Sequence, residues 1–298
     1  MGTFLSKIII VGVGLLGGSL GLALKKRKLA KSVIGVDSNP ECLADALRLG
    51  AIDRTATDLP EAFKFLGPPG EVDDPGNMRF SDLLVVCTPV GSIADVILEA
   101  ANLAGKRRLL ITDVGSTKQE IARKLDKQLP AQIRYVGSHP IAGSEKSGPQ
   151  HGTADLFARR LTVLTPTDEE TTSETAFLEH FWNLLGSSVI QIPPKQHDAV
   201  LARTSHFPHL LASLLLASLK IGDPMMVGSG FRSMTRLAAG DPVLWTDVFL
   251  SNKEAVTGAI DAMQKQLDSF RRLLDDDNQS AVLKLLTQSK KQRDALEK

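Results

Sequence analysis

Short apolar runs alternate with amphipathic stretches along the first two-thirds of the chain. The runs are rich in the β-branched residues that favour strands, and the stretches between them have helical periodicity. The runs occupy residues 7–11, 32–36, 82–88, 108–113 and 133–137. This alternation predicts a parallel sheet with right-handed crossovers and helices on both faces. Two further runs, 161–164 and 189–192, flank a helix expected near 169–185 and are expected to extend the same sheet.

The pattern changes after the prolines at 193 and 194, where strand signals end and helical periodicity continues. Helices are expected over residues 195–221, 242–273 and 278–296. The segment Leu210–Leu219 is apolar on nearly every side. It must therefore be buried, either within a helical bundle or at a dimer interface.

The first apolar run leads directly into a glycine-spaced turn with the pattern G-x-G-x-x-G. Gly12 allows a tight turn, Gly14 lets a pyrophosphate approach the backbone, and Gly17 lets the following helix pack closely on the strand. Because this turn joins a strand to a helix, its context fits a dinucleotide-binding loop. The motif predicts that the chain binds NAD.

Other residues at the ends of the predicted strands support the same cofactor. The helix after the glycines begins at Leu15 and Leu16, where free N–H groups and a partial positive charge suit phosphates. Asp37 ends the second strand, twenty residues after Gly17. An acid there accepts bonds from the ribose hydroxyls and repels a 2′-phosphate, so NAD is expected in preference to NADP. Thr88 and Pro89, which follow the third strand, complete the expected cofactor-binding residues.

Together these patterns predict an α/β N-terminal Rossmann-type domain with a parallel sheet, residues 1–192, and an all-α C-terminal dimerisation domain, residues 193–298. The 35 basic and 34 acidic residues nearly cancel, so neither nucleic acid nor a membrane is an expected partner. Glycines interrupt the apolar N-terminal run, and Leu210–Leu219 is too short to cross a bilayer. Two cysteines in no metal or redox spacing fit a cytoplasmic location.

Polar residues follow the fourth and fifth strands, at the sheet edge where ligands bind. His139, in the loop expected at 137–148, is the candidate acid–base residue, and the alternative is a structural histidine that bonds the loop. The reaction rate is then expected to rise with pH through the ordinary histidine range. Ser116 either holds a substrate oxygen or caps the next helix. Lys118 and Lys146 are expected to be solvated.

Two further polar clusters lie in the helical half. The first, residues 204–209, opens the apolar helix and fits a substrate site. His206 and His209 share no spacing with a third ligand, so no metal is expected. Arg236, in the second cluster at 228–236, either offers a planar fork to a substrate carboxylate or forms an interdomain salt bridge. The residues therefore predict an NAD-linked enzyme with an anionic substrate, and leave that substrate unspecified.

Several of these segments resemble the prephenate and arogenate dehydrogenases of tyrosine biosynthesis, and the resemblance covers nearly the whole chain. The matching segments, in family order, are Asp113–Lys118, His139–Glu145, Ser205–His209, Thr235–Ala238 and Asp241–Trp245. The resemblance implies a homodimer in which NAD+ takes a hydride from the ring carbinol while the ring carboxylate leaves as CO2. Prephenate would thereby become 4-hydroxyphenylpyruvate.

The resemblance also implies roles for individual residues. His139 would bond the ring hydroxyl and receive its proton, and Arg236 would bind a substrate carboxylate. Glu145 would sit at the mouth of the site as a polar gate. The remaining pocket residues would be Ser116, Ser144, Ser205 and His209.

Three alternatives remain open. The first is an arogenate or dual-specificity cyclohexadienyl dehydrogenase. Selectivity for arogenate needs an uncompensated carboxylate near the substrate ammonium, and Glu145, beside Lys146, is the only acid near the catalytic loop. The second is a β-hydroxyacid dehydrogenase, which needs a catalytic lysine that does not stand out between residues 200 and 240. The third is a non-catalytic NAD-sensing protein.

Overall fold

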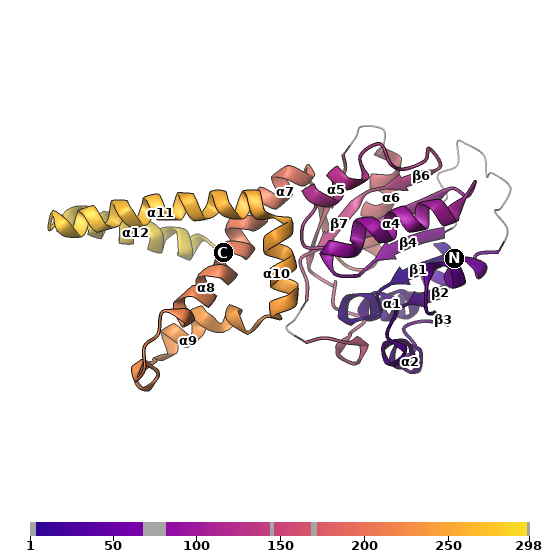
Figure 1. The fold of residues 1–298 in the computed structure, drawn as a ribbon, viewed down its shortest axis with the longest axis horizontal. Helices are drawn as coiled ribbons and strands as arrows, with labels where there is room; N and C mark the ends of the chain where they lie inside the picture. Colours follow the sequence, from indigo (N-terminus) through magenta and orange to yellow (C-terminus); the bar gives the residue numbers. More distant parts are fainter. Residues whose placement is uncertain (1–3, 68–81, 144–145, 168–171, 297–298) are drawn as a thin grey trace.

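The structure is a computed structural model that describes residues 4–67, 82–143, 146–167 and 172–296. An α/β part carries all the strands found in these residues, and a helical part extends away from it to one side (Figure 1). The strands are β1 (Leu5–Val11), β2 (Ala30–Val36), β3 (Arg54–Ala56), β4 (Asp82–Val86), β5 (Leu109–Asp113), β6 (Ile133–Tyr135), β7 (Gly137–Pro140), β8 (Leu161–Thr165) and β9 (Ser188–Gln191).

The main sheet has six parallel strands in the order β3-β2-β1-β4-β5-β6, which confirms the parallel sheet predicted from the alternating runs. The strand order reverses at β1, which pairs with β2 on one side and with β4 on the other. Ligands of such sheets bind beyond the carboxyl ends of the strands at this reversal. The end of β1 is where the glycine-rich turn begins.

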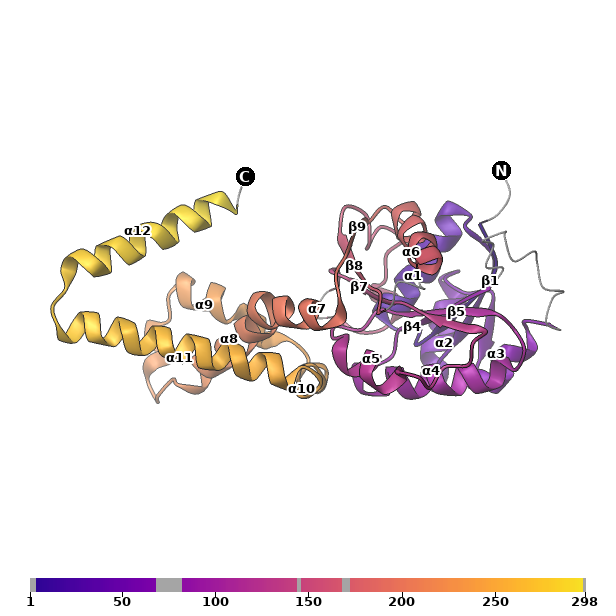
Figure 2. The same ribbon diagram turned by 90° about the horizontal axis from the view of Figure 1, so that it is seen from above.

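Helices cover both faces of this sheet (Figure 2). They are α1 (Leu15–Arg27), α2 (Pro40–Arg48), α3 (Leu59–Lys64), α4 (Val90–Ala104), α5 (Gln119–Leu125) and α6 (Thr172–Leu184). In β1, Ile8 and Ile10 pack into the core beneath α1 and α6, while Ile9 and Val11 pack into the core beneath α3 and α4. Because both faces are buried, the strand is a continuous apolar run.

A second sheet contains β7, β8 and β9, with β7 and β8 antiparallel and β8 and β9 parallel. The prediction that the runs near 161–164 and 189–192 extend the main sheet is therefore wrong. The chain leaves the main sheet at Val136, whose backbone N–H donates to Ile111 of β5, and Gly137 then pairs with Thr165. Trp182 anchors this second sheet, because it is fully buried and donates a hydrogen bond to Ser138 Oγ at 3.0 Å.

The helical part confirms the all-helical pattern after residue 193. Its helices are α7 (Pro194–Leu201), α8 (Phe207–Ala217), α9 (Ser229–Thr235), α10 (Pro242–Ser251), α11 (Lys253–Asp275) and α12 (Gln279–Ala295), and a π-helical segment, η3 (Ala202–His206), joins α7 to α8. The single helix expected over 242–273 is two helices. Asn252 ends α10 and begins α11 because its backbone leaves the helical region and its side chain bonds Asp198 and His206.

The apolar helix α8 is not buried within the chain, although burial on every side was expected. Only Ala212 is buried in it, and Leu214 and Leu216 are 55% and 41% exposed. Every residue of α12 is described and none is buried, and Figure 2 shows α12 leaving the end of α11 at an angle. None of the helices in the described ranges is long and apolar enough to span a membrane.

Candidate active site

Three glycines shape the turn between β1 and α1. Gly12 has a φ of +89°, which glycine adopts without strain, and a Cβ there would lie 2.7 Å from the carbonyl oxygen of Cys87. A Cβ on Gly17 would collide with the carbonyl oxygen of Gly12. Around the Cβ position of Gly14, the described part of the chain leaves open space for 4 Å. The turn is thus packed on its inner side and open at Gly14, where a phosphate can approach the backbone.

Asp37 lies beside this turn, at the carboxyl end of β2. Its Oδ2 accepts a hydrogen bond from the backbone N–H of Val13 at 3.0 Å, and its Oδ1 accepts one from Asn39 at 2.9 Å. No side chain in the described ranges caps α1. The N–H groups at its start, at Leu15 and Leu16, are therefore available to an anion.

Thr88 and Pro89 follow β4, the strand next to β1. Pro89 is the N-cap of α4, and the hydroxyl of Thr88 accepts a hydrogen bond from Ser92 at 3.0 Å. The expected cofactor-binding residues therefore all lie at the carboxyl ends of β1, β2 and β4, where the strand order reverses.

His139 lies in β7, opposite Val163 of β8, rather than in the loop expected for it. Its Nδ1 is 2.8 Å from Nε2 of His197 in α7. His197 Nδ1 is in turn 2.7 Å from Oδ1 of Asp198. His139 is partly buried, whereas the side chains of His197 and Asp198 are 0% and 1% exposed. The His139–His197–Asp198 chain thus links the second sheet to the first helix of the helical part.

Asp198 also caps α5. Its Oδ1 accepts the backbone N–H of Lys118 at 2.9 Å, and its Oδ2 accepts that of Gln119 at 2.9 Å. No side chain from the turn itself caps α5. The capping role considered for Ser116 is therefore wrong, and Ser116 remains as a partly buried hydroxyl between β5 and α5.

Burial lowers the pKa of His139 well below its ordinary value of 6.5. Electrostatic interactions with the neighbouring His197, Lys118 and His206 lower this pKa further. From the sequence, the reaction rate was expected to rise with pH through the ordinary histidine range. The lowered pKa of His139 places that rise at a lower pH. His139 is neutral in this environment, so it is already a proton acceptor when the pH passes 6.5.

Lys118 is buried rather than solvated, with 1% of its side chain exposed. Its ammonium forms an ion pair with Asp113, whose own side chain is fully buried. Asp113 Oδ1 also accepts a hydrogen bond from Tyr135 at 2.8 Å, and Oδ2 accepts the N–H of Gly115 at 2.8 Å. Burial lowers the pKa of Lys118, and Asp113 opposes that change. Lys146, the other lysine expected in solvent, is exposed.

A second group of side chains gathers around Trp245 in α10. His209 stacks on Trp245 with ring centroids 3.5 Å apart and 22° between the planes. Burial lowers the pKa of His209, and the positive charge of Arg236 lowers it further. Arg236 is exposed and forms no ion pair with any described residue, so the interdomain salt bridge considered for it is absent from this part of the chain.

His206 lies between the two groups. It is 1% exposed, its Nδ1 accepts a hydrogen bond from Asn252 at 3.0 Å, and burial lowers its pKa to about 4. His197 and His209 lie close enough to lower this pKa further. Ser205 precedes it in η3 and is partly buried. No group of three or more metal-ligating side chains occurs among the residues that the structure describes.

Two predicted site residues, Ser144 and Glu145, lie outside the described residues. Sequence reasoning missed His197 and Asp198, although both touch the candidate base or its partner. The only available signal was an adjacent histidine and aspartate soon after two prolines, at the start of a helix. Such a pair is common on exposed helices, so it does not by itself indicate a buried contact.

The glycine-rich turn at the strand reversal and the His139–His197–Asp198 chain beside the helical part indicate a dinucleotide-dependent dehydrogenase. Two family models match the chain: "prephenate dehydrogenase, nucleotide-binding domain" over residues 20–191 and "prephenate dehydrogenase, dimerization domain" over residues 193–288. The chain belongs to the prephenate dehydrogenase family, a family of NAD-dependent oxidoreductases.

Similar proteins agree with this assignment. Prephenate dehydrogenase of Bacillus subtilis is 30% identical over 97% of this chain and 76% of its own length. Cyclohexadienyl dehydrogenase of Zymomonas mobilis is 31% identical over 99% of this chain and 97% of its own. The structure of prephenate dehydrogenase from Aquifex aeolicus with hydroxyphenyl propionate and NAD+ superposes with a TM-score of 0.85, at 29% identity and 97% coverage of both chains. Arogenate dehydrogenase of Synechocystis gives a TM-score of 0.78 at 26% identity, covering 97% of this chain and 99% of that one.

Proposed function

We propose that this enzyme oxidises prephenate with NAD+, releasing CO2 and 4-hydroxyphenylpyruvate for tyrosine biosynthesis. The observation that carries the proposal is the position of His139 in β7, where His197 of the helical part holds its ring at 2.8 Å and burial lowers its pKa. NAD+ supplies a hydride acceptor when bound. The protein must then orient the substrate and manage one proton, because aromatisation of the ring drives the step.

In the proposed reaction, His139 accepts the proton of the ring hydroxyl. The hydride leaves from the carbon that bears this hydroxyl, and the C–O bond becomes a carbonyl. The bond between the ring and its carboxylate then breaks, CO2 leaves, and the bond's electron pair makes the ring aromatic. The product oxygen is a phenolate at that point, so it can take back the proton that His139 holds. Atoms, charge and electrons balance with one hydride transferred.

The residues of the cofactor loop fit a dinucleotide. Open space at Gly14 and the uncapped start of α1, at Leu15 and Leu16, would hold the pyrophosphate. Asp37 would accept hydrogen bonds from the ribose hydroxyls, with Thr88 and Pro89 beside the bound cofactor. Asp37 keeps a lone pair on each oxygen for this purpose, because each accepts only one hydrogen bond from the described residues, at 3.0 Å and 2.9 Å.

NAD+ is expected to give a higher kcat/KM than NADP+, because Asp37 repels a 2′-phosphate. Ser38 follows it and is exposed, so it offers no positive charge to offset that repulsion. The variant Ser38→Arg should raise kcat/KM for NADP+ and leave that for NAD+ nearly unchanged. Equal kcat/KM values for the two cofactors in the wild-type enzyme would contradict the role given to Asp37.

Arg236 is proposed to bind a substrate carboxylate, with Ser116, Ser205 and His209 around the substrate. Arg236 lies close enough to His209 for its charge to lower the pKa of that histidine. Stacking on Trp245 holds the His209 ring in place. Arg236 has no carboxylate partner among the described residues, which leaves its guanidinium fork available for a bidentate contact. For Ser144 and Glu145, a place at the mouth of the site remains a proposal from the sequence.

Arg236→Gln is expected to raise KM for the substrate by about 10–100-fold, because a hydrogen bond to a charged group contributes roughly 1.5–3 kcal/mol. KM for NAD+ should change little. Arg232→Gln is the matched control, since Arg232 is exposed in α9, one turn earlier. Steady-state kinetics on both variants test the proposal, and an unchanged substrate KM in Arg236→Gln would remove Arg236 from the site.

Prephenate is proposed over arogenate because the buried acids near His139 are already occupied. Both oxygens of Asp113 and both oxygens of Asp198 accept hydrogen bonds from protein groups. Neither is available to the ammonium that distinguishes arogenate from prephenate, and a buried ammonium without a partner is costly. Measuring kcat/KM for both compounds under one set of conditions tests this choice. A tenfold advantage for arogenate would overturn it and would point to Glu145 as the partner of the ammonium.

We place the boundary between the two domains after residue 192, where β9 has ended and Pro193 precedes α7. We also propose that the enzyme works in the cytoplasm, in keeping with its two unpaired cysteines, Cys42 and Cys87.

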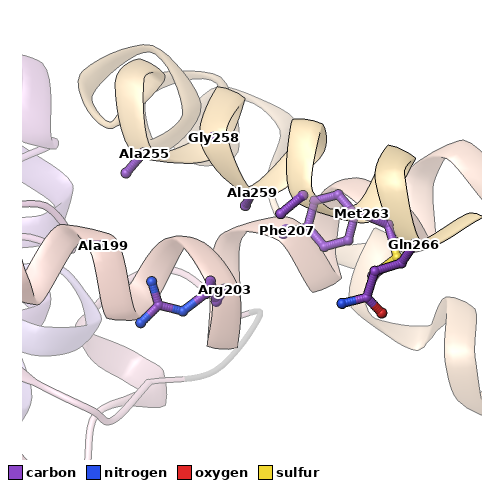
Figure 3. A pocket seen from close by; sticks show the side chains of 9 residues that line it. Ala199, Arg203, Phe207, Ala255, Gly258, Ala259, Met263 and Gln266 are labelled. Atoms are coloured by element: carbon purple, nitrogen blue, oxygen red, sulfur yellow. The ribbon is translucent and has the colours of Figure 1, made fainter. Parts of the chain in front are cut away.

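A homodimer formed through the helical half is proposed from its uncovered apolar surface. A groove of about 410 Å³ lies between η3, the start of α8 and α11, and the side chains of Phe207 and Met263 are among those that line it (Figure 3). Along α11 this groove is lined by small residues such as Ala255 and Gly258, which let a second helix approach closely. Leu211 and Leu215 of α8 line an adjoining hollow that shares Phe207 and Met263 with this groove.

Light scattering at micromolar concentration is expected to give about 64 kDa, twice the 32.1 kDa of one chain. Replacing Leu214 and Leu216 together with Glu should shift the mass towards the monomer, since both are exposed on α8. Leu47→Glu is the matched control, because Leu47 is 46% exposed on α2 in the other half. A wild-type mass near 32 kDa would contradict the proposed interface.

A further inference from the structure

The buried pair His197–Asp198 lies directly behind the base proposed above, and nothing in the sequence motifs assigns it a role. It reaches His139 from the other half of the molecule, since α7 begins the helical part. The pair is shielded from solvent on all sides, whereas His139 is partly exposed. A polar pair this deeply buried needs a defined arrangement of donors and acceptors.

Asp198 determines the arrangement of donors and acceptors in this pair, because backbone N–H groups donate hydrogen bonds to both of its carboxylate oxygens. Its Oδ1 accepts the N–H of Lys118 and its Oδ2 accepts the N–H of Gln119, each at 2.9 Å. A proton on either oxygen would have to share that oxygen's lone pairs with these donors. The carboxylate therefore acts as an acceptor towards its third neighbour, His197 Nδ1 at 2.7 Å, and that nitrogen must carry a proton.

The position of the proton on His197 in turn determines the position of the proton on His139. With its single proton on Nδ1, His197 keeps a lone pair on Nε2, so it accepts the hydrogen bond at 2.8 Å from His139 Nδ1. His139 must then be the donor in this contact. A neutral imidazole has one proton, so Nε2 of His139 is left unprotonated on the side away from His197.

We infer that Asp198 and His197 are positioning residues that hold His139 as the Nδ1–H tautomer, with Nε2 free to accept the hydroxyl proton of the substrate. The role of this nitrogen in catalysis rests on the proposed function, whereas the tautomer itself is a property of the free protein. The opposite tautomer would present an N–H to the hydroxyl oxygen and could not take its proton.

The charged and titratable groups that face His139 come from several elements, and they favour its neutral form. Lys118, at the start of α5, and His206, in η3, lie near enough to lower the pKa of His139, as does His197 in α7. Lys118 is itself paired with Asp113, and Asp198 lies near both Lys118 and Tyr135. A single neutral tautomer is therefore expected across the neutral pH range.

Nitrogen-15 NMR of histidine-labelled protein without ligands tests the inference directly, because protonated and unprotonated ring nitrogens have well-separated shifts. The spectrum of His139→Asn assigns the His139 signals among those of the six histidines. We expect Nδ1 of His139 to be protonated and Nε2 to be unprotonated in the wild-type protein at neutral pH. The reverse pattern would overturn the inference, whatever the activity of the enzyme.

Asp198→Asn is the second arm. An amide can place its NH2 group towards His197 Nδ1, which would reverse both histidine tautomers. We expect the His139 shifts to report a reversed or mixed tautomer and kcat for prephenate to fall by about 10–100-fold, with KM for NAD+ unchanged. His197→Gln, which can still accept from His139 through its amide oxygen, should retain more kcat than His197→Phe.

Asp82→Asn is the matched control, because Asp82 is also a buried carboxylate but lies at the start of β4, at the opposite end of the sheet. It should leave the His139 signals unchanged. If Asp198→Asn does not fold, the wild-type spectrum and the two His197 variants still decide the outcome. Correct tautomers without turnover of prephenate would refute the proposed function alone, whereas normal turnover with the reverse tautomer would refute this inference alone.

Discussion

Replacing His139 with Asn is expected to lower kcat by about 10²–10⁴, the usual contribution of a positioned acid–base group. Asparagine keeps a polar side chain of similar reach, but it cannot accept the hydroxyl proton at neutral pH. The cofactor loop lies on other elements, so the affinity for NAD+ should stay within about twofold of wild type. Steady-state kinetics and a separate NAD+ titration measure the two quantities, and near-normal kcat in His139→Asn would show that another group is the base.

The pH dependence of the wild-type enzyme gives a second test of the same residue. The base must be neutral to work, and burial together with neighbouring positive charge lowers the pKa of His139 well below 6.5. As pH falls, activity is therefore lost only below the ordinary histidine range, and kcat/KM should be level from about pH 6.5 upwards. A titration of kcat/KM centred at or above 6.5 would contradict this environment.

Replacing Lys118 with Met is expected to lower the free energy of unfolding by about 3–5 kcal/mol, because it leaves the Asp113 carboxylate buried without its countercharge. Tyr135 and Gly115 would still donate to Asp113, but neither carries a charge. Denaturant unfolding at neutral pH measures the loss. The double variant Lys118→Met with Asp113→Asn should recover part of it, because the amide is neutral.

The exposed pair Lys290–Asp294 provides the control for that experiment. It has the same chemistry at 2.8 Å, but 74% of the Lys290 side chain is exposed. Lys290→Met should therefore cost no more than about 0.5 kcal/mol. A loss below about 1 kcal/mol for Lys118→Met would show that Asp113 has another means of neutralisation and that Lys118 is not needed to hold the turn after β5.

Local patterns were sufficient to predict five of the six strands of the main sheet and the glycine-rich turn, but not the three-residue strand β3. Both faces of β1 are buried, which makes it a continuous apolar run, and close contacts around their Cβ positions require glycine at Gly12 and Gly17. The second sheet was not predictable in the same way. Its strands are four or five residues long, and nothing in a short apolar run says whether it pairs with β6 or with β7.

The candidate site shows the same division. His139 and Arg236 could be proposed from the sequence because they occur in polar segments at expected positions. The roles of His197, Asp198 and Lys118 depend on contacts between residues far apart in the chain: His139 and His197 are 58 residues apart, and Lys118 and Asp198 are 80 apart. In the sequence, a lysine in a polar turn cannot be distinguished from a solvated lysine. The structure shows that Asp113 lies beside the ammonium of Lys118.

The exposed α8 is a different case, because its sequence predicts burial and leaves open whether a helical bundle or a dimer interface provides it. A single chain leaves Leu214 and Leu216 uncovered, and the groove beside Phe207 is open. The homodimer proposed above would bury this surface against a second copy. Periodicity alone cannot distinguish burial within one chain from burial between two.

The most direct test of the account is to incubate the purified protein with prephenate and NAD+ and to quantify the products. We predict equimolar NADH, CO2 and 4-hydroxyphenylpyruvate, formed in the wild-type protein and nearly abolished in His139→Asn. If neither prephenate nor arogenate reduces NAD+ in the presence of the folded wild-type protein, the chain is not a dehydrogenase of this kind and the account is contradicted.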